Sequence, residues 1–380
     1  MSNYFVLMNK DRALANLMVN RNYIDVLRYD KVLDTLFANP CEWIKGRIES
    51  ARRHNINDIF KVGNIDTLEE CIKVTHCVSA TDTFWFKTLN ETTNWQDVSV
   101  FSNRISKLIA NAAIDGVHLL GNANAKSPSP QYNVIGTADK CIKCENGKLI
   151  LFKSSGIAEF GINTRPYVEG VVTQVAKALG FKTVVTYDVK ETYIRSRNCY
   201  KPYCMCELVT NENTGLINYC DSKYNETNLM QIAKHFMITN DKVGLQRLRE
   251  MLLLDSICMN VDRHDENYAF EYDTNRLSIR TISRAFDFDC SLGATLPVLS
   301  KSVEDDYNKL MNIGPKTLNN FNEQAEIFMS RSIYDKLKDV GTIKIDFSKM
   351  NGLNKKRRDL IEYIINRRIK EIVALIDTRV

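Results

Sequence analysis

The sequence lacks the long apolar segments that mark membrane and exported proteins. No stretch of about 18 uncharged apolar residues occurs, which excludes a typical transmembrane helix. Near the start, Lys10, Asp11 and Arg12 stand beside short apolar runs, so the unbroken apolar core of a secretory signal is missing. Internal repeats and low-complexity tracts are also missing. We therefore expect a globular, cytoplasmic protein without membrane contact.

Charge of one sign is not in strong excess. The 51 Lys and Arg residues against 46 Asp and Glu residues leave a formal net charge of +5. This balance does not resemble the dense basic patches of dedicated nucleic-acid binders, so we expect no direct nucleic-acid binding. A hydrophobic content of 44% in 380 residues is enough for the cores of two or three domains.

A disulfide framework is not indicated, because the 11 cysteines are odd in number, scattered, and expected in a reducing compartment. One metal motif is weakly suggested: Cys141-x-x-Cys144 could form a zinc site with Cys199, Cys204 and Cys206. The alternation of residue types around these cysteines is more typical of strand residues in a reduced protein. Whether Cys141 and Cys144 bind metal stays open.

The chain divides into three predicted segments. A stretch of small and polar residues with two prolines, Gly121–Pro130, is typical of a linker or an exposed loop. The segments are an amino-terminal α+β extension (1–125), a β-rich small lobe (126–210) and a mainly helical large lobe (211–380). Within the first segment we expect a strand at Tyr4–Met8 and a helix at Asn64–Val74 capped by Asp66.

The second segment shows the order strand, strand, helix, strand. The predicted elements are a hairpin of Asn133–Lys143 and Lys148–Lys153 turning at Glu145-Asn146-Gly147, a helix at Val168–Leu179 stopped by Gly180, and a strand at Lys182–Val189. This order is typical of a kinase small lobe.

The third segment is predicted to be mainly helical, because apolar residues recur at intervals of three and four. The predicted helices are Leu229–Met237, Val243–Asn260 and Leu353–Ile376, with one strand pair at Asn267–Tyr272 and Leu277–Ile282.

The residues that suggest chemistry follow the predicted helix Val243–Asn260. Asp262 and Asn267 stand five residues apart, which is the interval of protein-kinase catalytic loops. In such loops the Asp orients the attacking hydroxyl and the Asn oxygen binds Mg²⁺. One hairpin later, Asp287 follows a strand with an aromatic residue on each side, which is the setting of a metal-binding carboxylate. His264 lies between Asp262 and Asn267.

Candidate phosphate-binding groups lie upstream. Lys153 closes the second strand of the hairpin, and Glu169 in the following helix is the expected partner of its charge. Gly136 and Thr137 could approach phosphates with backbone N–H groups. Taken singly, these residues are better explained as an edge lysine, a first-turn acid and a plain turn. Their order along the chain favours the kinase interpretation.

The loop Asn260-Val-Asp-Arg-His-Asp-Glu-Asn267 resembles the Asn-x-Asp-Arg-His-x-x-Asn motif of HipA-like kinases, and its core also occurs in phosphoinositide kinases. Phe286–Leu292 is similar to the Phe-Asp-Asn-Gly-x-Ser-Leu motif of the same family, which makes Asp287 the expected metal ligand. Asp289 departs from that motif, because a glycine is usual at its position.

The resemblance extends over most of the chain. The helix within Tyr167–Phe181 and the segment Cys206–Thr210 are similar to the family's helix and hinge, so that Glu207 and Val209 would meet the adenine. Thr81–Lys87 and Asn94–Val98 look like an extension found in a bacterial subset of the family.

The resemblance implies an α+β, two-lobed protein-kinase-like fold with an amino-terminal α+β extension, which binds ATP and Mg²⁺ between its lobes. It implies transfer of phosphate to Ser or Thr of an unidentified protein, with autophosphorylation in the glycine-containing loop and Thr137 as a candidate. Some members are inhibited by an antitoxin, so an antitoxin-like regulator is a candidate partner.

Two alternatives remain from the residues. The first is a lipid or small-molecule kinase, for which Lys355-Lys-Arg-Arg358 would favour an anionic surface, although a solvated helix start explains these residues better. The second is a nucleotide-binding pseudokinase.

Overall fold

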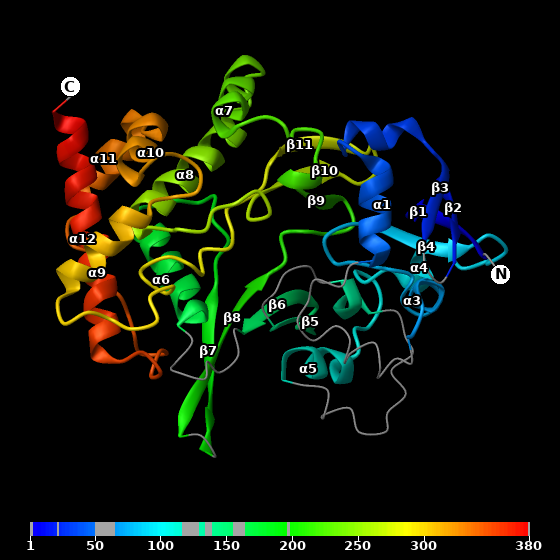
Figure 1. Ribbon diagram of the computed structural model, residues 1–380, viewed down its shortest axis with the longest axis horizontal. Coiled ribbons are helices and arrows are strands. Elements are labelled where there is room, and N and C mark those ends of the chain that lie inside the picture. Colours follow the sequence, from blue (N-terminus) through cyan, green and yellow to red (C-terminus); the bar gives the residue numbers. More distant parts are fainter. Residues whose placement is uncertain are drawn as a thin grey trace. The chain divides into compact units, whose positions relative to one another are not determined.

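The computed structural model describes residues 3–20, 23–49, 65–115, 129–133, 139–154, 164–195 and 198–378. The chain forms two compact units, each assembled from three stretches of sequence. Unit 1 comprises Met1–Lys153, Glu207–Glu226 and Ala269–Arg280, and unit 2 comprises Ser154–Cys206, Thr227–Tyr268 and Thr281–Val380. Figure 1 labels their helices and strands.

Unit 1 begins with a four-stranded antiparallel sheet in the order β3-β2-β1-β4. Its strands are β1 (Asn3–Asn9), β2 (Arg12–Val19), β3 (Ile24–Tyr29) and β4 (Phe84–Thr88). Five successive residues of β1, from Phe5 to Asn9, are buried, so both faces of this strand are covered. The helices of the unit are α1 (Pro40–Glu49), α3 (Leu68–Thr75), α4 (Trp95–Val98) and α5 (Lys107–Asp115).

Two further strand groups complete unit 1. Strands β5 (Asp139–Glu145) and β6 (Lys148–Ser154) form the predicted hairpin, and both residues of its turn have positive φ, 51° at Asn146 and 77° at Gly147. A two-residue turn with this backbone matches the twist of the paired strands. The other group has the order β11-β10-β9, with β9 (Thr214–Asn218), β10 (Ala269–Asp273) and β11 (Ser278–Ile282).

One apolar core joins the amino-terminal sheet of unit 1 to the β5–β6 hairpin. Val6, Trp85 and Trp95 are buried in the same cluster as Ile142 of β5. Leu149, Leu151 and Leu208 pack against this cluster from the hairpin and the segment after β8. The predicted boundaries at residues 125 and 210 stay predictions, but the two regions on either side of residue 125 share this core.

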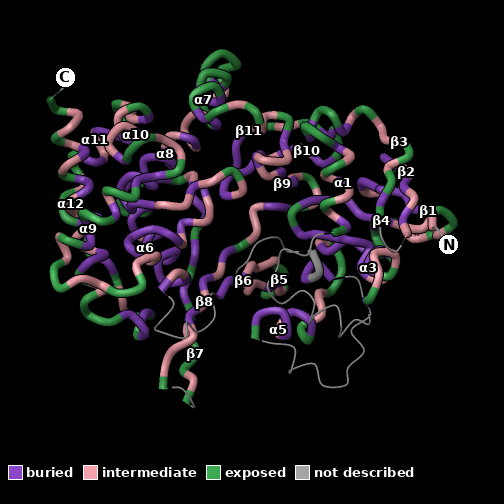
Figure 2. Tube along the Cα trace, in the orientation of Figure 1, coloured by how far each residue is buried: buried purple, intermediate pink, exposed green. Residues whose placement is uncertain are grey.

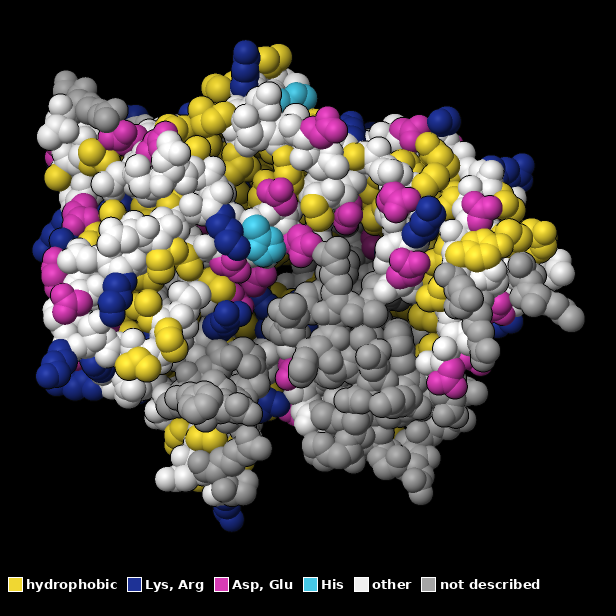
Figure 3. All heavy atoms as spheres, in the orientation of Figure 1, with side chains coloured by type: hydrophobic (Ala, Val, Ile, Leu, Met, Phe, Trp, Pro, Cys, Tyr) yellow, Lys and Arg dark blue, Asp and Glu magenta, His cyan; other side chains and the backbone are white. Residues whose placement is uncertain are grey.

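Unit 2 is mainly helical and is organised around α8. Its elements are α6 (Arg165–Ala178), β7 (Asp188–Ile194), β8 (Cys199–Glu207), α7 (Leu229–Ile238), α8 (Lys242–Cys258), α9 (Val303–Ile313), α10 (Phe321–Phe328), α11 (Arg331–Asp339) and α12 (Lys355–Asp377). Helices α6, α7, α10 and α12 all pack against α8. Helix α7 projects from the rest of unit 2 (Figure 1) and exposes Met237 and Ile238. Figure 3, in the same orientation, shows apolar side chains over this projection.

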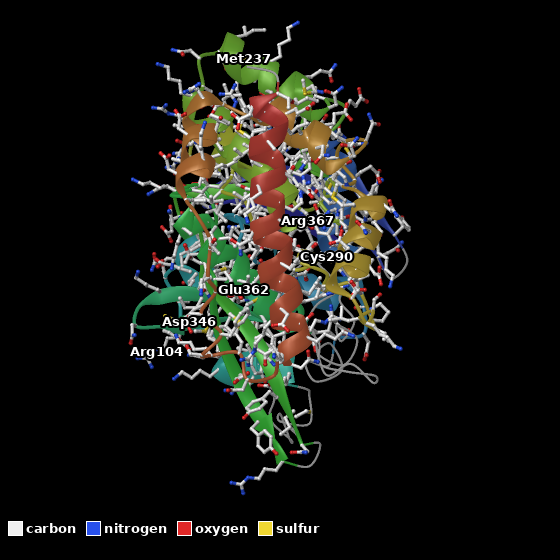
Figure 4. All side chains as sticks on the ribbon, turned by 90° about the vertical axis from the view of Figure 1, so that its left-hand side faces the viewer. Arg104, Met237, Cys290, Asp346, Glu362 and Arg367 are labelled. Carbon is white, nitrogen blue, oxygen red and sulfur yellow. The ribbon has the colours of Figure 1, made fainter. Side chains whose placement is uncertain are left out.

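The carboxyl-terminal helix α12 packs its predicted apolar stripe inward. Leu360, Ile361, Ile364 and Ile365 are all buried. On the side shown in Figure 4, Arg367 forms ion pairs with Glu304 of α9 and with Glu371 one turn further along α12. Within the part of the chain that the structure describes, no helix is both long and apolar enough to cross a membrane.

Most long elements expected from periodicity are confirmed, and several helices and strands were not foreseen. Strand β1, α6, α7, α8, α12 and the β10–β11 pair occupy the predicted stretches, and the β5–β6 hairpin is present from Asp139 onward. Helix α3 is also present, but its cap is Thr67 rather than Asp66, because the Thr67 side chain accepts the Glu70 N–H in a capping box. The helices α9, α10 and α11 and the strand β9 were not predicted.

The predicted strand at Lys182–Val189 is wrong over most of its length. Only Val184 forms an isolated parallel bridge, and the regular strand β7 starts at Asp188. Side chains occupy the backbone donors that a sheet would use: Thr183 N–H donates to Glu250, and Tyr187 N–H donates to Thr173 Oγ1 at 2.9 Å. Side-chain acceptors therefore replace the ladder in this stretch.

Gly215 of β9 is the position where the packing of unit 1 tolerates no side chain. A Cβ placed there would lie 2.2 Å from the ring of Tyr272, which is itself fully buried. We expect Gly215→Ala to lower the free energy of unfolding by roughly 1–3 kcal/mol through overpacking, as measured by denaturant unfolding.

Gly46→Ala is the matched control, because nothing lies within 4 Å of a Cβ at this exposed position inside α1. It should raise the free energy of unfolding by up to about 1 kcal/mol through helix propensity. Equal effects of the two substitutions would contradict the packing around Tyr272.

Candidate active site

Helix α8 carries the candidate site at its carboxyl end. Every residue of Glu250–Cys258 is buried, and Figure 2 shows this half of the helix inside unit 2. At Met259 the backbone turns left-handed with φ of 52°, and the N–H groups of Met259 and Asn260 both donate to the carbonyl of Asp255. The chain therefore leaves the core at a fixed angle and enters the loop that holds Asp262.

A buried ion pair joins this helix to the loop. Arg263 Nε lies 2.9 Å from Asp255 Oδ2, and Arg263 Nη2 lies 3.0 Å from Oδ1, so the contact is bidentate. Both side chains are fully buried, and Asn260 Nδ2 also donates to Asp255 at 2.8 Å. Burial acts to lower the pKa of Arg263, but the charge and hydrogen bonds of Asp255 outweigh burial and raise it. Arg263 is therefore a fixed cation engaged inside the protein.

The remaining donors of Arg263 reach a second segment. Its Nη1 donates to the carbonyl oxygens of Asn267 and Phe286, each at 2.5 Å. The guanidinium also lies over the ring of Phe288, 4.6 Å from the centroid. Because Phe286 and Phe288 flank Asp287, one side chain fixes both the loop and the segment of the predicted metal ligand.

Asp262 has a carboxylate that is partly open to solvent and surrounded by donors. Its side chain is 34% exposed, and Oδ1 forms an ion pair with Lys316 Nζ. The other oxygen accepts from the thiol of Cys290 at 3.6 Å and lies 3.9 Å from His264 Nε2. Burial, followed by the charge of Asp289, raises the pKa of the Cys290 thiol, so this group stays protonated and donates. Because this carboxylate is partly exposed, an incoming hydroxyl can reach it and be oriented by it.

Asn267 is oriented by the backbone of the same loop. Its Nδ2 donates to the Asp262 carbonyl at 2.8 Å, and its N–H donates to the His264 carbonyl at 2.8 Å. His264 in turn accepts the Glu266 N–H on Nδ1 at 3.2 Å, which holds the imidazole in the loop. With the amide nitrogen engaged in this way, the side-chain oxygen of Asn267 is the end suited to a cation.

Asp287 lies in a backbone conformation that most residues avoid, with φ of 61°. On one side Ala285 exchanges backbone hydrogen bonds with Thr183 and Val185, at 2.9 and 2.8 Å. On the other side Phe288 donates its N–H to the carboxylate of Glu169 of α6 at 3.1 Å, and Glu169 is itself buried. Fixed neighbours on both sides therefore hold Asp287 in place.

Three residues around this loop have left-handed backbone conformations. Met259, Asp287 and Leu292 all have positive φ, and the N–H of Leu292 donates to the carbonyl of Cys258 at 2.8 Å at the end of α8. Each such conformation costs of order 1–3 kcal/mol and persists only where the surrounding contacts fix it, as is common at functional sites. The strain supports a functional interpretation of this region.

The donor chemistry of the site fits magnesium. Asn267 and Asp287 offer amide and carboxylate oxygens, and Mg²⁺ is typically bound by one or two such protein oxygens together with water and substrate phosphates. Among the described residues there is no group of three or more His, Cys, Asp or Glu side chains that would form a complete protein cage for a metal. Cys141 is buried and Cys144 is exposed on β5, as expected for strand residues.

The other predicted site residues belong to unit 1. Lys153 is buried near the end of β6, and its predicted pairing with Glu169 stays a prediction. Glu207 is exposed, and its carboxylate lies 2.7 Å from Lys148 Nζ. Val209 follows in an irregular segment.

Gly136 and Thr137 lie outside the described residues.

Three contributors to the site were not identified from the sequence. Asp255 and Cys290 are near the two motifs, but only the fold shows that they bind Arg263 and Asp262. Lys316 follows Gly314-Pro315 in a connection between α9 and α10, and no spacing relates it to the loop. The Arg263 of the motif was the one available signal for a buried acid nearby.

The fold and this loop together define a protein with a protein-kinase-like α+β fold, as the sequence predicted. Among solved structures, the chain matches HipA of Shewanella oneidensis MR-1, determined with HipB and operator DNA as a toxin–antitoxin system. The TM-score is 0.53 at 12% identity, and the match covers 98% of each chain. The fold is therefore the HipA-like kinase fold.

A second match is the proinflammatory kinase CtkA of Helicobacter pylori, with a TM-score of 0.45 at 15% identity. It covers 65% of this chain and 92% of the CtkA chain. No protein-family model matches the sequence, and no curated protein does.

The Asp255–Arg263 pair generates a stability prediction. Asp255→Ala would leave a buried guanidinium without its counter-charge, so we expect the free energy of unfolding to fall by roughly 3–5 kcal/mol in denaturant titrations. Asp335→Ala is the control, because it removes an acid from the exposed pair with Arg331. That variant should change stability by less than about 0.5 kcal/mol. Similar losses in both variants would contradict the role given to Asp255.

Proposed function

We propose that this protein is an ATP- and Mg²⁺-dependent protein serine/threonine kinase of the HipA-like type. The observation that carries the proposal is the coupling of two motifs by Arg263. This residue hydrogen-bonds the backbone at Asn267 and at Phe286, beside Asp287. Asp262, Asn267 and Asp287 are thereby held by one buried framework, with the Asp262 carboxylate accessible. This is the set of groups that phosphoryl transfer requires.

The proposed reaction needs little covalent chemistry from the protein. The oxygen of a Ser or Thr hydroxyl forms a bond to the γ-phosphorus, the bond from that phosphorus to the β–γ bridging oxygen breaks, and ADP leaves with the electron pair. Asp262 orients the hydroxyl and receives its proton. His264 lies beside Asp262 and is assigned a supporting role in the same loop. Positioning and charge neutralisation provide most of the acceleration.

Asn267 and Asp287 are the residues that would hold Mg²⁺. When bound, the metal would neutralise charge on the β- and γ-phosphates. The hydrogen bond from Asn267 Nδ2 to the Asp262 carbonyl fixes the position of this ligand relative to the proposed base, Asp262. The contact between Glu169 and the Phe288 N–H does the same for Asp287.

For the nucleotide, we propose Lys153 as the cation on the phosphates, with Glu169 as its partner and Gly136 and Thr137 as backbone donors. Glu207 and Val209 are proposed to meet the adenine. Leu208 donates its N–H to the Leu149 carbonyl at 2.9 Å, so this donor is already used within unit 1. We therefore assign the adenine contacts to Glu207 and Val209, on either side of Leu208.

Autophosphorylation, with Thr137 as a candidate acceptor, belongs to the same proposal, as does a location in the cytoplasm. The HipA structure that this chain matches was determined with HipB and operator DNA. An antitoxin-like regulator is accordingly a candidate partner of this chain, beside its unidentified protein substrate.

The contacts of the basic helix start weaken the alternative of a lipid kinase. Lys356 donates to the Leu299 carbonyl at 3.0 Å, and Arg357 donates to the Gly293 carbonyl at 2.5 Å. Arg358 donates to the carbonyls of Leu353 and Met350, each at 2.9 Å. Three of the four cations thus stabilise their own surroundings instead of forming an open basic patch that could bind an anionic lipid surface. A nucleotide-binding pseudokinase remains the outcome in which ATP binds without transfer.

The first test is incubation of the purified protein with γ-labelled ATP and Mg²⁺, followed by mass spectrometry. We expect label on Ser or Thr, and a loss of roughly 10²–10⁴-fold in rate for Asp262→Ala, because a general base contributes about this factor. Asp287→Ala should lose transfer as well. Circular dichroism and thermal melting should show that both variants fold.

Protein and phosphoinositide acceptors are to be offered in parallel. Label on the lipid alone would reassign the acceptor, and bound ATP without any label would indicate a pseudokinase. An active Asp262→Ala protein would contradict the assignment of the base.

Asn267→Ala generates a separate prediction about the metal. It removes one oxygen ligand, so the Mg²⁺ concentration for half-maximal transfer should rise, and excess Mg²⁺ should restore part of the rate. Chelation with EDTA should abolish transfer by the wild type. A variant with unchanged Mg²⁺ dependence would show that Asn267 serves only to order the loop.

A further inference from the structure

Lys316 forms an ion pair with the proposed base, although it comes from a distant part of unit 2. Helix α9 ends at Ile313 and is capped by Gly314, whose φ is 71° and whose N–H donates to the Leu310 carbonyl at 3.1 Å. Pro315 follows and restricts the backbone before Lys316. The ammonium group of Lys316 then contacts Asp262 Oδ1. The connection between α9 and α10 thus places Lys316 next to the Asp262 carboxylate.

The backbone next to Lys316 is anchored to the helix that carries the site. Thr317 Oγ1 donates to Gln324 Oε1 of α10. Gln324 is fully buried, and its Nε2 donates to the Leu252 carbonyl at 2.8 Å and to Ser256 Oγ at 3.1 Å. Both acceptors belong to α8, so the base of the Lys316 side chain is fixed relative to Asp262. A residue on a free surface loop would have no such support.

The far end of the side chain is free to move. The Lys316 side chain is 54% exposed and that of Asp262 is 34% exposed. An ion pair in such surroundings contributes little to stability, so Lys316 can exchange this carboxylate for another anion at small cost. Arg263 cannot take this role, because its guanidinium is occupied by Asp255 and by backbone carbonyls. His264 Nε2 is at 3.9 Å from the same carboxylate and carries charge only when protonated.

We propose that Lys316 is a catalytic residue that leaves Asp262 when ATP and the acceptor bind and contacts a non-bridging oxygen of the transferred phosphoryl group. This inference rests on the proposed function. An acceptor hydroxyl that donates to Asp262 places the phosphoryl group one group away from the carboxylate that Lys316 contacts. Release of the lysine frees Asp262 to accept the hydroxyl proton, and its charge offsets the charge on the phosphoryl oxygens as the bond to the β–γ bridging oxygen breaks.

The test compares steady-state kinetics of Lys316→Met, Lys316→Arg and Lys309→Met with labelled ATP. Loss of a donor to the transition state typically costs about 10²–10³-fold in kcat, so Lys316→Met should lose this much, while the KM for ATP should rise by at most about fivefold. Lys316→Arg keeps the charge and should recover part of the rate.

Lys309→Met is the matched control, because Lys309 is 53% exposed and also pairs with an aspartate, Asp306, outside the site. Its kcat should match the wild type. A Lys316→Met protein with wild-type or higher kcat would overturn the proposal, since Lys316 would then only shield Asp262. Equal losses in Lys316→Met and Lys309→Met would overturn it too.

A binding measurement separates this inference from the proposed function. Calorimetry in the presence of Mg²⁺ should show that Lys316→Met raises the Kd for ATP by up to about fivefold relative to the Kd for ADP. This factor corresponds to the roughly 1 kcal/mol that an exposed ion pair contributes at most. If the wild type binds ATP but transfers nothing, the proposed kinase activity fails. In that case, the proposed contact between Lys316 and the γ-phosphate is supported if Lys316→Met loses the preference for ATP over ADP. It is rejected if that preference is unchanged.

Discussion

The buried pair of Arg263 and Asp255 is the interaction on which the geometry of the candidate site depends. A bidentate contact in a fully buried position has one low-energy arrangement, so it fixes the direction in which the loop leaves α8. The same guanidinium also holds the carbonyl of Phe286. Removing charge from water is costly, and here that cost is offset by hydrogen bonds that orient two separate segments. The pair therefore serves specificity of structure more than stability.

The site combines a fixed framework with side chains that can move at its solvent-exposed side. Asn267 and the backbone around Asp287 are tied to buried partners, and Glu169 supports them from α6. Asp262 and Lys316 instead extend from fixed backbone into solvent, where ions can exchange. This division matches what phosphoryl transfer requires, because the groups that orient substrate need a preorganised frame, whereas the groups that bind the moving charge must release it in each cycle.

Local signals account for what the sequence predicted. The Asn146-Gly147 turn, the apolar period of α8 and α12, and the Asp262-to-Asn267 interval are all encoded by neighbours in the chain. The features that the sequence did not predict depend on contacts between segments far apart in the chain. At Thr183 a side chain of α8 replaces the expected strand ladder, and Lys316 reaches the site only because Gln324 ties its loop to α8. No pattern of spacing could reveal either contact. The fold class was predictable because the motifs and element order are local, whereas the side chains that complete the site come from remote segments.

The shared core of unit 1 has a consequence for how the protein can be divided. Ile142, Leu149 and Leu151 rest on Val6, Trp85 and Trp95 from the amino-terminal region. A fragment that began after residue 125 would carry the β5–β6 hairpin with this apolar side uncovered, and such patches promote association between molecules. The amino-terminal region therefore covers the apolar side of the hairpin as an intramolecular binding partner, and expression, labelling or fusion designs need to keep both on the same chain.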